Sequence, residues 1–177
     1  MKKTIIMALF MCLGAITFGQ QPKKTIASET LEAIKNDVWV PFMEAYDQLD
    51  SEKIKSIHSM DIVRVTIDQN NIETGNPYLD GFGGFIESMK TQGNKLGIAF
   101  AILSTATNAT GDIAYQRGYY RLSSQGKGDE TLQIRGYGYF NVGLRKEDGI
   151  WKIWLDSDSH TSISHDEFNN SEIVYEL

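Results

Sequence analysis

The sequence predicts an α+β fold in which N-terminal helices cover one face of a curved sheet. Three observations support this fold class. Apolar residues recur at helical spacing between Ser28 and Leu49. From Leu96 onward the pattern changes to long segments of alternating polarity, which are typical of strands. These segments are separated by "NATG", "QGKGDE" and "EDG", which have the composition of hairpin turns.

The N-terminus has the features of a secretory signal peptide. Lys2 and Lys3 precede an apolar run of about a dozen residues, and small residues follow before Gln20. The run is too short to span a bilayer comfortably, although a retained anchor helix is the alternative interpretation. The sequence therefore predicts a signal peptide over 1–19, a single domain over 20–177, a secreted or periplasmic location, and no stable membrane anchor after cleavage.

The mature chain is acidic and free of cysteine. Removing Lys2 and Lys3 leaves 15 of the 17 basic residues against 23 acidic residues, a net charge of −8. Nucleic acid and anionic lipid both require a positive protein surface, so neither is expected as the main partner. Without cysteine the mature chain has neither a disulfide nor a thiol nucleophile, and its stability has to come from packing.

The first expected helix begins near Ser28, a suitable N-cap, and runs to about Leu49. Pro41 lies inside this helix, where its ring removes one backbone hydrogen-bond donor. We therefore expect a kink near Asp37, or a break into two pieces.

Two shorter helices are expected next. The segment "DSEKIKSIH" predicts a helix capped by Asp50 or Ser51 and closed by His58. A further helix is predicted from about Gly83 to Thr91, with Gly93 as its C-cap. The glycines just before it indicate either a tight approach of the backbone to a neighbouring element or a loop.

The strands are predicted from alternation. "DIVRVTID" places Val63 and Val65 opposite Arg64, and a short second strand is expected near Ile72. About four long antiparallel strands follow. They are expected within "KLGIAFAILSTAT", "DIAYQRGYYRLSS", "TLQIRGYGYFNVGLRK" and "IWKIWLDSD".

The order and composition of these segments resemble the nuclear-transport-factor-2-like superfamily, in its SnoaL-like branch. The similarity extends from about Thr30 to Ser159 and is carried by "VWVPFMEAYDQLD", "IHSMDIVRV", "GDIAYQRGYYRL" and, most specifically, "FNVGLRKEDGIWKIWLDSDS". The resemblance implies a cystatin-like cone: kinked N-terminal helices packed on a strongly curved, mostly antiparallel sheet that forms a cone-like half-barrel. It also implies a pocket between helices and sheet, and a homodimer through the sheet. Because such proteins include isomerases, cyclases, dehydratases and binding modules, the fold alone does not select a function.

Alternation sorts the strand residues onto two faces, provided that no bulge interrupts the count. One face is aliphatic and is expected to pack on the helices; in the last strand it carries Trp151, Ile153 and Leu155. The other face is rich in tyrosine, tryptophan and charge, and in the last strand it carries Trp154 and Asp156, with Lys152, Asp158 and His160. Two partners can cover this second face: a second copy of the chain in a homodimer, or a polar pocket in which Arg64 lies near Asp156.

Two residues are candidates for proton transfer. Asp156 would have a raised pKa in an enclosed apolar pocket and could act as a general base, or it is a surface or interface carboxylate paired with Arg64 or Arg117. His58, at the end of a helix, would be favoured in its protonated form by up to about 2 kcal/mol. It could act as an acid or base at a pocket mouth, or serve as a helix cap.

The function stays open among three alternatives. The first is a domain that binds a small, largely apolar molecule between helices and sheet, with candidate ligand-binding residues Trp39, Tyr46, Arg64, Tyr137 and Trp154. The second is an isomerase, cyclase or dehydratase that uses Asp156 or His58 as base. The third is a dimeric interaction module that uses the aromatic sheet face.

No cofactor or metal is expected. The sequence contains no phosphate loop, nucleotide fingerprint, serine elbow or zinc motif. "DSDSH" and "TSISHD" together offer acidic and histidine side chains, but their spacing matches no ligand signature. We therefore interpret this segment as a solvated acidic end.

Overall fold

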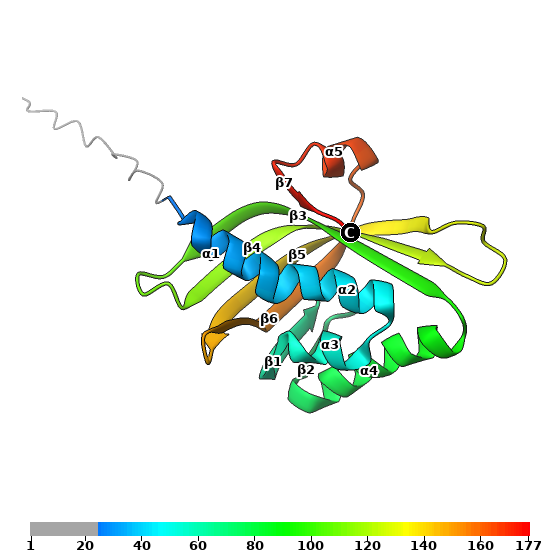
Figure 1. Ribbon diagram of the computed structural model, residues 1–177, viewed down its shortest axis with the longest axis horizontal. Coiled ribbons are helices and arrows are strands. Elements are labelled where there is room, and N and C mark those ends of the chain that lie inside the picture. Colours follow the sequence, from blue (N-terminus) through cyan, green and yellow to red (C-terminus); the bar gives the residue numbers. More distant parts are fainter. Residues whose placement is uncertain (1–24) are drawn as a thin grey trace, which may run out of the picture.

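A computed structural model describes residues 25–177, arranged as a layer of N-terminal and central helices on one side of a single seven-stranded sheet and a short C-terminal helix on the other (Figure 1). The predicted signal peptide lies outside the described residues. Within 25–177, no helix is both long and apolar enough to cross a membrane.

The N-terminal helix is interrupted where Pro41 predicts it. α1 (Ser28–Ile34) and α2 (Val40–Gln48) are separated by one π-helical turn, η1 (Lys35–Trp39). Pro41 has no N–H to donate to the carbonyl of Asp37, and the wider turn, in which the Val40 N–H donates to the Lys35 carbonyl, accommodates its ring. The expected break near Asp37 is therefore confirmed. Ser28 is not the N-cap: Ala27 takes that position, without a side-chain bond.

Two further helices complete this layer. Asp50 caps α3 (Ser51–Ser56), as expected, by accepting hydrogen bonds from the Glu52 and Lys53 N–H groups at 3.1 and 2.9 Å. α4 (Gly75–Thr91) begins at Gly75, so the expected start at Gly83 is wrong. The glycine cluster lies inside this helix, where an added Cβ on Gly83 would stand 3.3 Å from the side chain of Lys55. The loop interpretation is therefore wrong, and a close approach is found at Gly83 but not at Gly81 or Gly84, which have no neighbour within 4 Å of an added Cβ.

The sheet has the strand order β2-β1-β6-β5-β4-β3-β7. All neighbouring strands are antiparallel except β1 and β6, which run parallel. The strands are β1 (His58–Thr66), β2 (Asn71–Thr74), β3 (Lys95–Thr107), β4 (Ile113–Gln125), β5 (Gln133–Glu147), β6 (Ile150–Thr161) and β7 (Ile173–Tyr175). A short turn, η2 (Ile67–Gln69), joins β1 to β2.

The sheet is mixed and mostly antiparallel, but it is not strongly curled, so the expected cone-like half-barrel is too strong a description. The strand order is open, because β2 and β7 end the sheet and pair with one strand each. Both edge strands are short, which limits how far the sheet can close on itself.

The C-terminal segment covers part of the outer face, the side of the sheet turned away from α1, α2 and α4. It consists of α5 (His165–Asn169) and β7, neither of which the sequence analysis expected. Phe168 is fully buried against Ala99 and Ala101, and Arg121 on β4 pairs with Glu176. This end of the chain is therefore folded onto the sheet and is not a solvated acidic tail.

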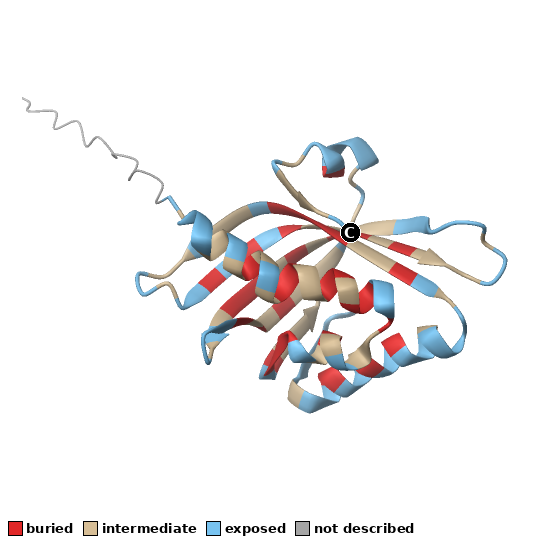
Figure 2. Ribbon diagram, in the orientation of Figure 1, coloured by how far each residue is buried: buried red, intermediate tan, exposed pale blue. Residues whose placement is uncertain are grey.

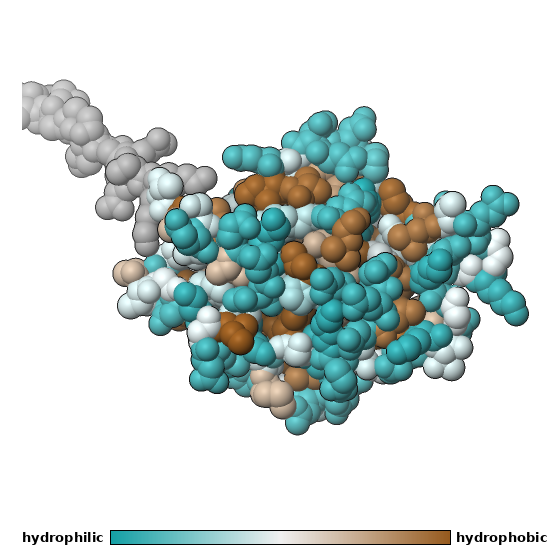
Figure 3. Space-filling model, viewed as in Figure 1, coloured by the Kyte–Doolittle hydropathy of each residue, from teal (hydrophilic) through white to brown (hydrophobic). Residues whose placement is uncertain are grey.

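The main core lies between the helices and the sheet, where buried positions line both layers (Figure 2). Polar side chains cover most of the surface on the helix side, with apolar patches between them (Figure 3). On β5, Phe140, Val142 and Leu144 are buried toward the helices, which confirms the expected alternation for that strand.

On β6 the expected alternation fails at a bulge. Gly143 pairs with Leu155 and Leu144 pairs with Ile153, so Trp154 has no partner on β5. The extra residue shifts the count by one. Trp151 and Ile153 face the helices as expected, but beyond the bulge this side is occupied by Asp156 and Asp158, whereas Trp154 and Leu155 lie outside next to Gly143.

Candidate functional site

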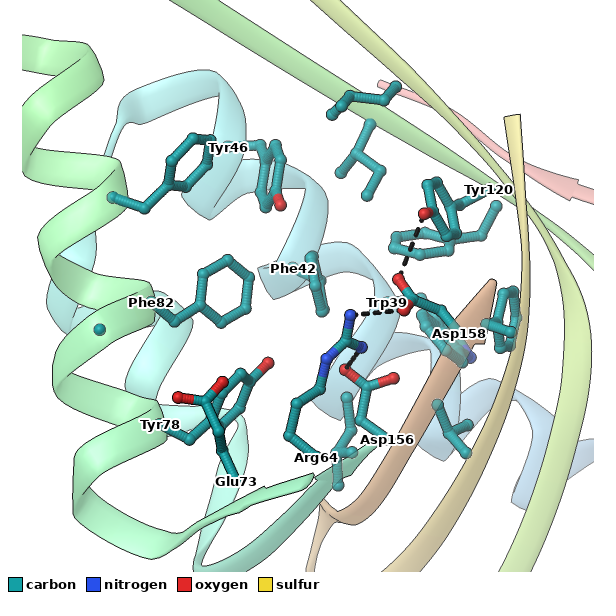
Figure 4. A pocket seen from close by; sticks show the side chains of 18 of the residues that line it. Trp39, Phe42, Tyr46, Arg64, Glu73, Tyr78, Phe82, Tyr120, Asp156 and Asp158 are labelled. Atoms are coloured by element: carbon teal, nitrogen blue, oxygen red, sulfur yellow. Dashed lines mark hydrogen bonds and ion pairs between the residues drawn. The ribbon is translucent and has the colours of Figure 1, made fainter. Parts of the chain in front are cut away.

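A cavity of about 620 Å³ lies between the helices and the sheet (Figure 4). The π-helical turn η1 and helices α2 and α4 form one wall, and strands β1 to β6 form the other. Its lining is mainly aromatic and aliphatic, with one charged group of side chains. The lining residues are Trp39, Phe42, Tyr46, Arg64, Gln69, Glu73, Tyr78, Gly81, Phe82, Phe85, Ile98, Phe100, Tyr120, Leu122, Phe140, Val142, Ile153, Asp156 and Asp158.

Trp39 anchors the aromatic part of the wall. Its ring centroid lies 4.6 Å from that of Phe100 and 5.2 Å from that of Phe140. The indole Nε1 donates a hydrogen bond of 2.8 Å to Oε1 of the buried Gln116, whose amide donates in turn to Thr105. A buried Trp needs such a partner, and the bond holds the indole with one face against the cavity.

The charged part of the wall follows from strand register. Arg64 on β1 stands opposite Glu73 on β2 and opposite Asp156 on β6, so one row of the sheet reads Glu73, Arg64, Asp156. All three side chains line the cavity. The row exists because the bulge at Trp154 turns Asp156 toward the helices.

Arg64 reaches between two carboxylates (Figure 4). Its Nη1 lies 2.6 Å from Oδ2 of Asp156, and its Nη2 lies 2.6 Å from Oδ1 of Asp158. The Tyr120 hydroxyl donates to Oδ2 of Asp158 at 3.2 Å. The Arg64, Asp156 and Asp158 side chains are less than one-fifth exposed, which makes these charge-assisted bonds stronger than surface ion pairs.

The cavity shifts the pKa of the groups that line it. Burial raises the pKa of the Asp156 carboxyl, and Asp158 adds to this rise, whereas Arg64 and the Tyr78 hydroxyl oppose it. Burial tends to lower the pKa of Arg64, but its carboxylate neighbours outweigh that effect and raise it, so the guanidinium stays charged. The site therefore joins a fixed cation to a carboxyl that takes up a proton more readily than usual.

His58 lies behind the cavity wall and is not part of the lining. It begins β1 and does not close the preceding helix. Its ring packs against Phe42, Tyr78 and Phe82, and its Nδ1 lies 2.7 Å from the carbonyl oxygen of Ile54 in α3. Burial lowers the pKa of His58 to about 4, so the expected protonated imidazole is wrong and the ring is neutral near pH 7. The contact with α3 matches the capping interpretation.

The structure separates the other candidate residues into two groups. Trp39, Tyr46, Arg64 and Asp156 line the cavity. Tyr137 lies on the outer face, where its ring packs on Phe168 with centroids 5.6 Å apart and its hydroxyl lies 3.0 Å from Nδ1 of His165. Trp154 lies on the outer face beside Gly143, because the bulge shifts the alternation of β6 by one residue.

Several lining residues were not among the candidates. Tyr78 and Phe82 were missed because the start of α4 was placed too late; their spacing of four residues is a helical signal that the glycines obscured. Tyr120 and Phe140 lie on the helix-facing side of the sheet, which the sequence predicts as a packing surface and not as a cavity wall. Asp158 could have been found with Asp156, since residues two apart on a strand share a face.

Comparisons with known proteins give the fold. No family model matches the chain, and no curated protein matches it significantly. Among solved structures it is similar to a ketosteroid isomerase-like protein from Erwinia carotovora atroseptica (TM-score 0.57, 17% identity, 77% of this chain and 100% of that chain). It is also similar to ActVI-ORFA from Streptomyces coelicolor (TM-score 0.62, 10% identity, 77% and 100%). A third similar structure is an NTF2-like protein with a cystatin-like fold from Novosphingobium aromaticivorans (TM-score 0.56, 14% identity, 78% and 86%). The chain thus has the fold of the nuclear-transport-factor-2-like proteins, as its sequence resemblance implies.

Proposed function

We propose that this chain is a secreted or periplasmic domain that binds a small, largely apolar molecule in the cavity between helices and sheet. The observation that carries the proposal is the cavity itself: about 620 Å³, walled mainly by aromatic rings, with a few charged groups gathered on β1, β2 and β6. This volume falls within the range usual for ligand sites, roughly 300 to 1,000 Å³. The apolar walls supply affinity, and the few polar groups orient the ligand.

Filling the cavity is expected to abolish binding. Ile98 and Leu122 pair across β3 and β4, and both line the cavity. Replacing both by tryptophan occupies ligand space, so we expect the affinity for naphthylethanol, a neutral apolar probe, to fall at least about tenfold, equivalent to about 1.4 kcal/mol. Isothermal titration calorimetry measures the change. The matched control is Ile134→Trp, on an exposed part of β5, which should bind like the wild type. Equal affinity in a correctly folded double variant would contradict the proposal.

A second candidate function is an enzyme of the isomerase, cyclase or dehydratase type. The observation that favours it is Asp156, whose buried carboxyl has a raised pKa and whose Oδ1 is the oxygen that Arg64 does not bind. Such a group can remove a proton from the carbon next to a ketone and return it elsewhere. His58 is less suited, because its ring lies outside the cavity lining.

Deuterium exchange tests this second candidate. The wild type is expected to speed the uptake of deuterium from D₂O at the benzylic carbon of phenylacetone, and Asp156→Asn should lose about 10²-fold to 10⁴-fold of that acceleration. The control is Asp61→Asn, which removes an exposed carboxylate paired with Arg145. If Asp156→Asn exchanges deuterium as fast as the wild type, Asp156 is not the base.

A third proposal concerns the outer face, which we expect to join two copies of the chain. It is supported by Tyr115, which is 42% exposed, and by the partly exposed Tyr139 and Trp154. Aromatic side chains of this kind are enriched in interface cores. Trp154→Glu should convert a dimer to a monomer in sedimentation equilibrium. An unchanged mass would argue against this interface. α5 already covers part of the outer face, which limits the area that a second copy can contact.

A further inference from the structure

We propose that the ligand of this cavity is a cation: an aromatic or similarly apolar amine, and not a carboxylic acid. The inference rests on the proposed binding function and adds the chemical class of the ligand. It follows from how the charge of Arg64 is balanced, from the acceptors of the charged group that remain available, and from the surplus of acidic over basic side chains in the lining.

The positive charge of Arg64 is already balanced by two carboxylates. Each of its two terminal nitrogens lies 2.6 Å from a carboxylate oxygen, one on Asp156 and one on Asp158. A ligand carboxylate at the guanidinium would face the negative charge of both partners, and it would have to displace one of them to take its place. The displaced aspartate would then be left partly buried without its counter-charge, which costs several kcal/mol. Arg64 is therefore a poor receptor for an anion.

Acidic side chains, by contrast, outnumber basic side chains in the lining. Among the described residues, the carboxylates of Glu73, Asp156 and Asp158 line the cavity, and Arg64 is the one basic side chain in the lining. Arg64 does not bind Oδ1 of Asp156, although the Tyr78 hydroxyl also bonds to this carboxylate. Oδ2 of Asp158 accepts a hydrogen bond from the Tyr120 hydroxyl at 3.2 Å, longer than usual for two oxygens. Glu73 is exposed at the edge of the same row (Figure 4). An ammonium group has three donors to offer to such oxygens.

The aromatic side chains of the lining also favour a positively charged ligand. Burial raises the pKa of the Tyr46, Tyr78 and Tyr120 hydroxyls, and the nearby aspartates raise it further. These groups therefore stay protonated and neutral, so the charge of the lining is set by Arg64 and the three acidic side chains. The faces of the aromatic rings carry negative partial charge and attract a cation within about 6 Å. Trp39, Phe42 and Phe82 supply such faces around the charged row.

A matched set of probes tests the inference. Naphthylethylamine, naphthylethanol and naphthylpropanoate share one ring system and differ mainly in the charge at the end of the chain. In calorimetric titrations at pH 7 and low salt, we expect the amine to bind at least about tenfold more tightly than the alcohol, and the propanoate to bind more weakly than either. Glu73→Gln, at an exposed position, should lower the preference for the amine severalfold, whereas Glu130→Gln, exposed in a loop outside the lining, should leave it unchanged.

The outcomes separate this inference from the function on which it rests. If the alcohol binds but the amine binds no more tightly, the cation preference is overturned and the binding function stands. If the propanoate binds most tightly, the cation preference is also overturned, because the acidic surplus of the lining should repel it. If none of the three binds at millimolar concentration, the proposed binding function fails and the cation preference fails with it.

Discussion

Replacing Arg64 by methionine is expected to lower the free energy of unfolding by about 3 to 5 kcal/mol at pH 7. Arg64 binds Asp156 and Asp158 at 2.6 Å each, and all three side chains are largely buried. Methionine keeps much of the side-chain volume but leaves two neighbouring carboxylates without a counter-charge. Denaturation with urea, monitored by circular dichroism, measures the loss.

Two further variants separate charge from volume. Arg117→Met removes an arginine whose Nε bonds to Ser104 at an exposed site on the outer face, and it should cost less than about 1 kcal/mol. Adding Asp156→Asn and Asp158→Asn to Arg64→Met removes the uncompensated charges and should restore a substantial part of the lost stability. If Arg64→Met costs no more than Arg117→Met, the buried charged group is not as the structure describes it.

Replacing His58 by glutamine is expected to weaken the pH dependence of stability. Burial lowers the pKa of His58 from 6.5 to about 4 in the folded chain. Because the unfolded chain binds the proton more readily, the contribution of His58 is fully present above pH 6.5 and is lost as the pH falls toward 4. Over that window the wild type should lose about 3 kcal/mol more than His58→Gln. Urea denaturation at a series of pH values measures the difference.

The control is His160→Gln, an exposed histidine, which should follow the wild-type pH curve. Asp156 acts in the opposite direction: its pKa is raised in the folded chain, so its contribution falls as the pH rises through the folded-state value. Since all three proteins keep Asp156, its effect cancels from the comparison. Parallel curves for the wild type and His58→Gln would show that His58 is not buried in its neutral form.

Much of the fold could be predicted because it depends on local patterns. The alternation of polar and apolar residues predicted β3, β4 and β5 in nearly the segments where the structure has them. Pro41 predicted the interruption of the first helix, since a missing donor acts within one turn. The predicted shape of the sheet was wrong. It depends on how strands far apart in the sequence pair with one another and on where those strands end.

The site was harder to predict because one bulge decides it. Counting along β6 placed Trp154 and Asp156 on the same face, and a single unpaired residue at Trp154 reverses that relation. The proximity of Arg64 to Asp156 was one of two open alternatives, and the structure gives it as an ion pair inside the cavity. The start of α4 was misjudged because its glycines have low helix propensity, which packing overrides.

The central claim is that the cavity between helices and sheet is a ligand site, and methyl NMR tests it most directly. A methyl-labelled sample is titrated with naphthylethylamine or naphthylethanol. We expect the largest chemical-shift changes at the cavity methyls of Ile98, Leu122, Val142 and Ile153. Changes confined to methyls outside the lining, such as those of Leu155 and Ile134, or no changes at all, would contradict the account.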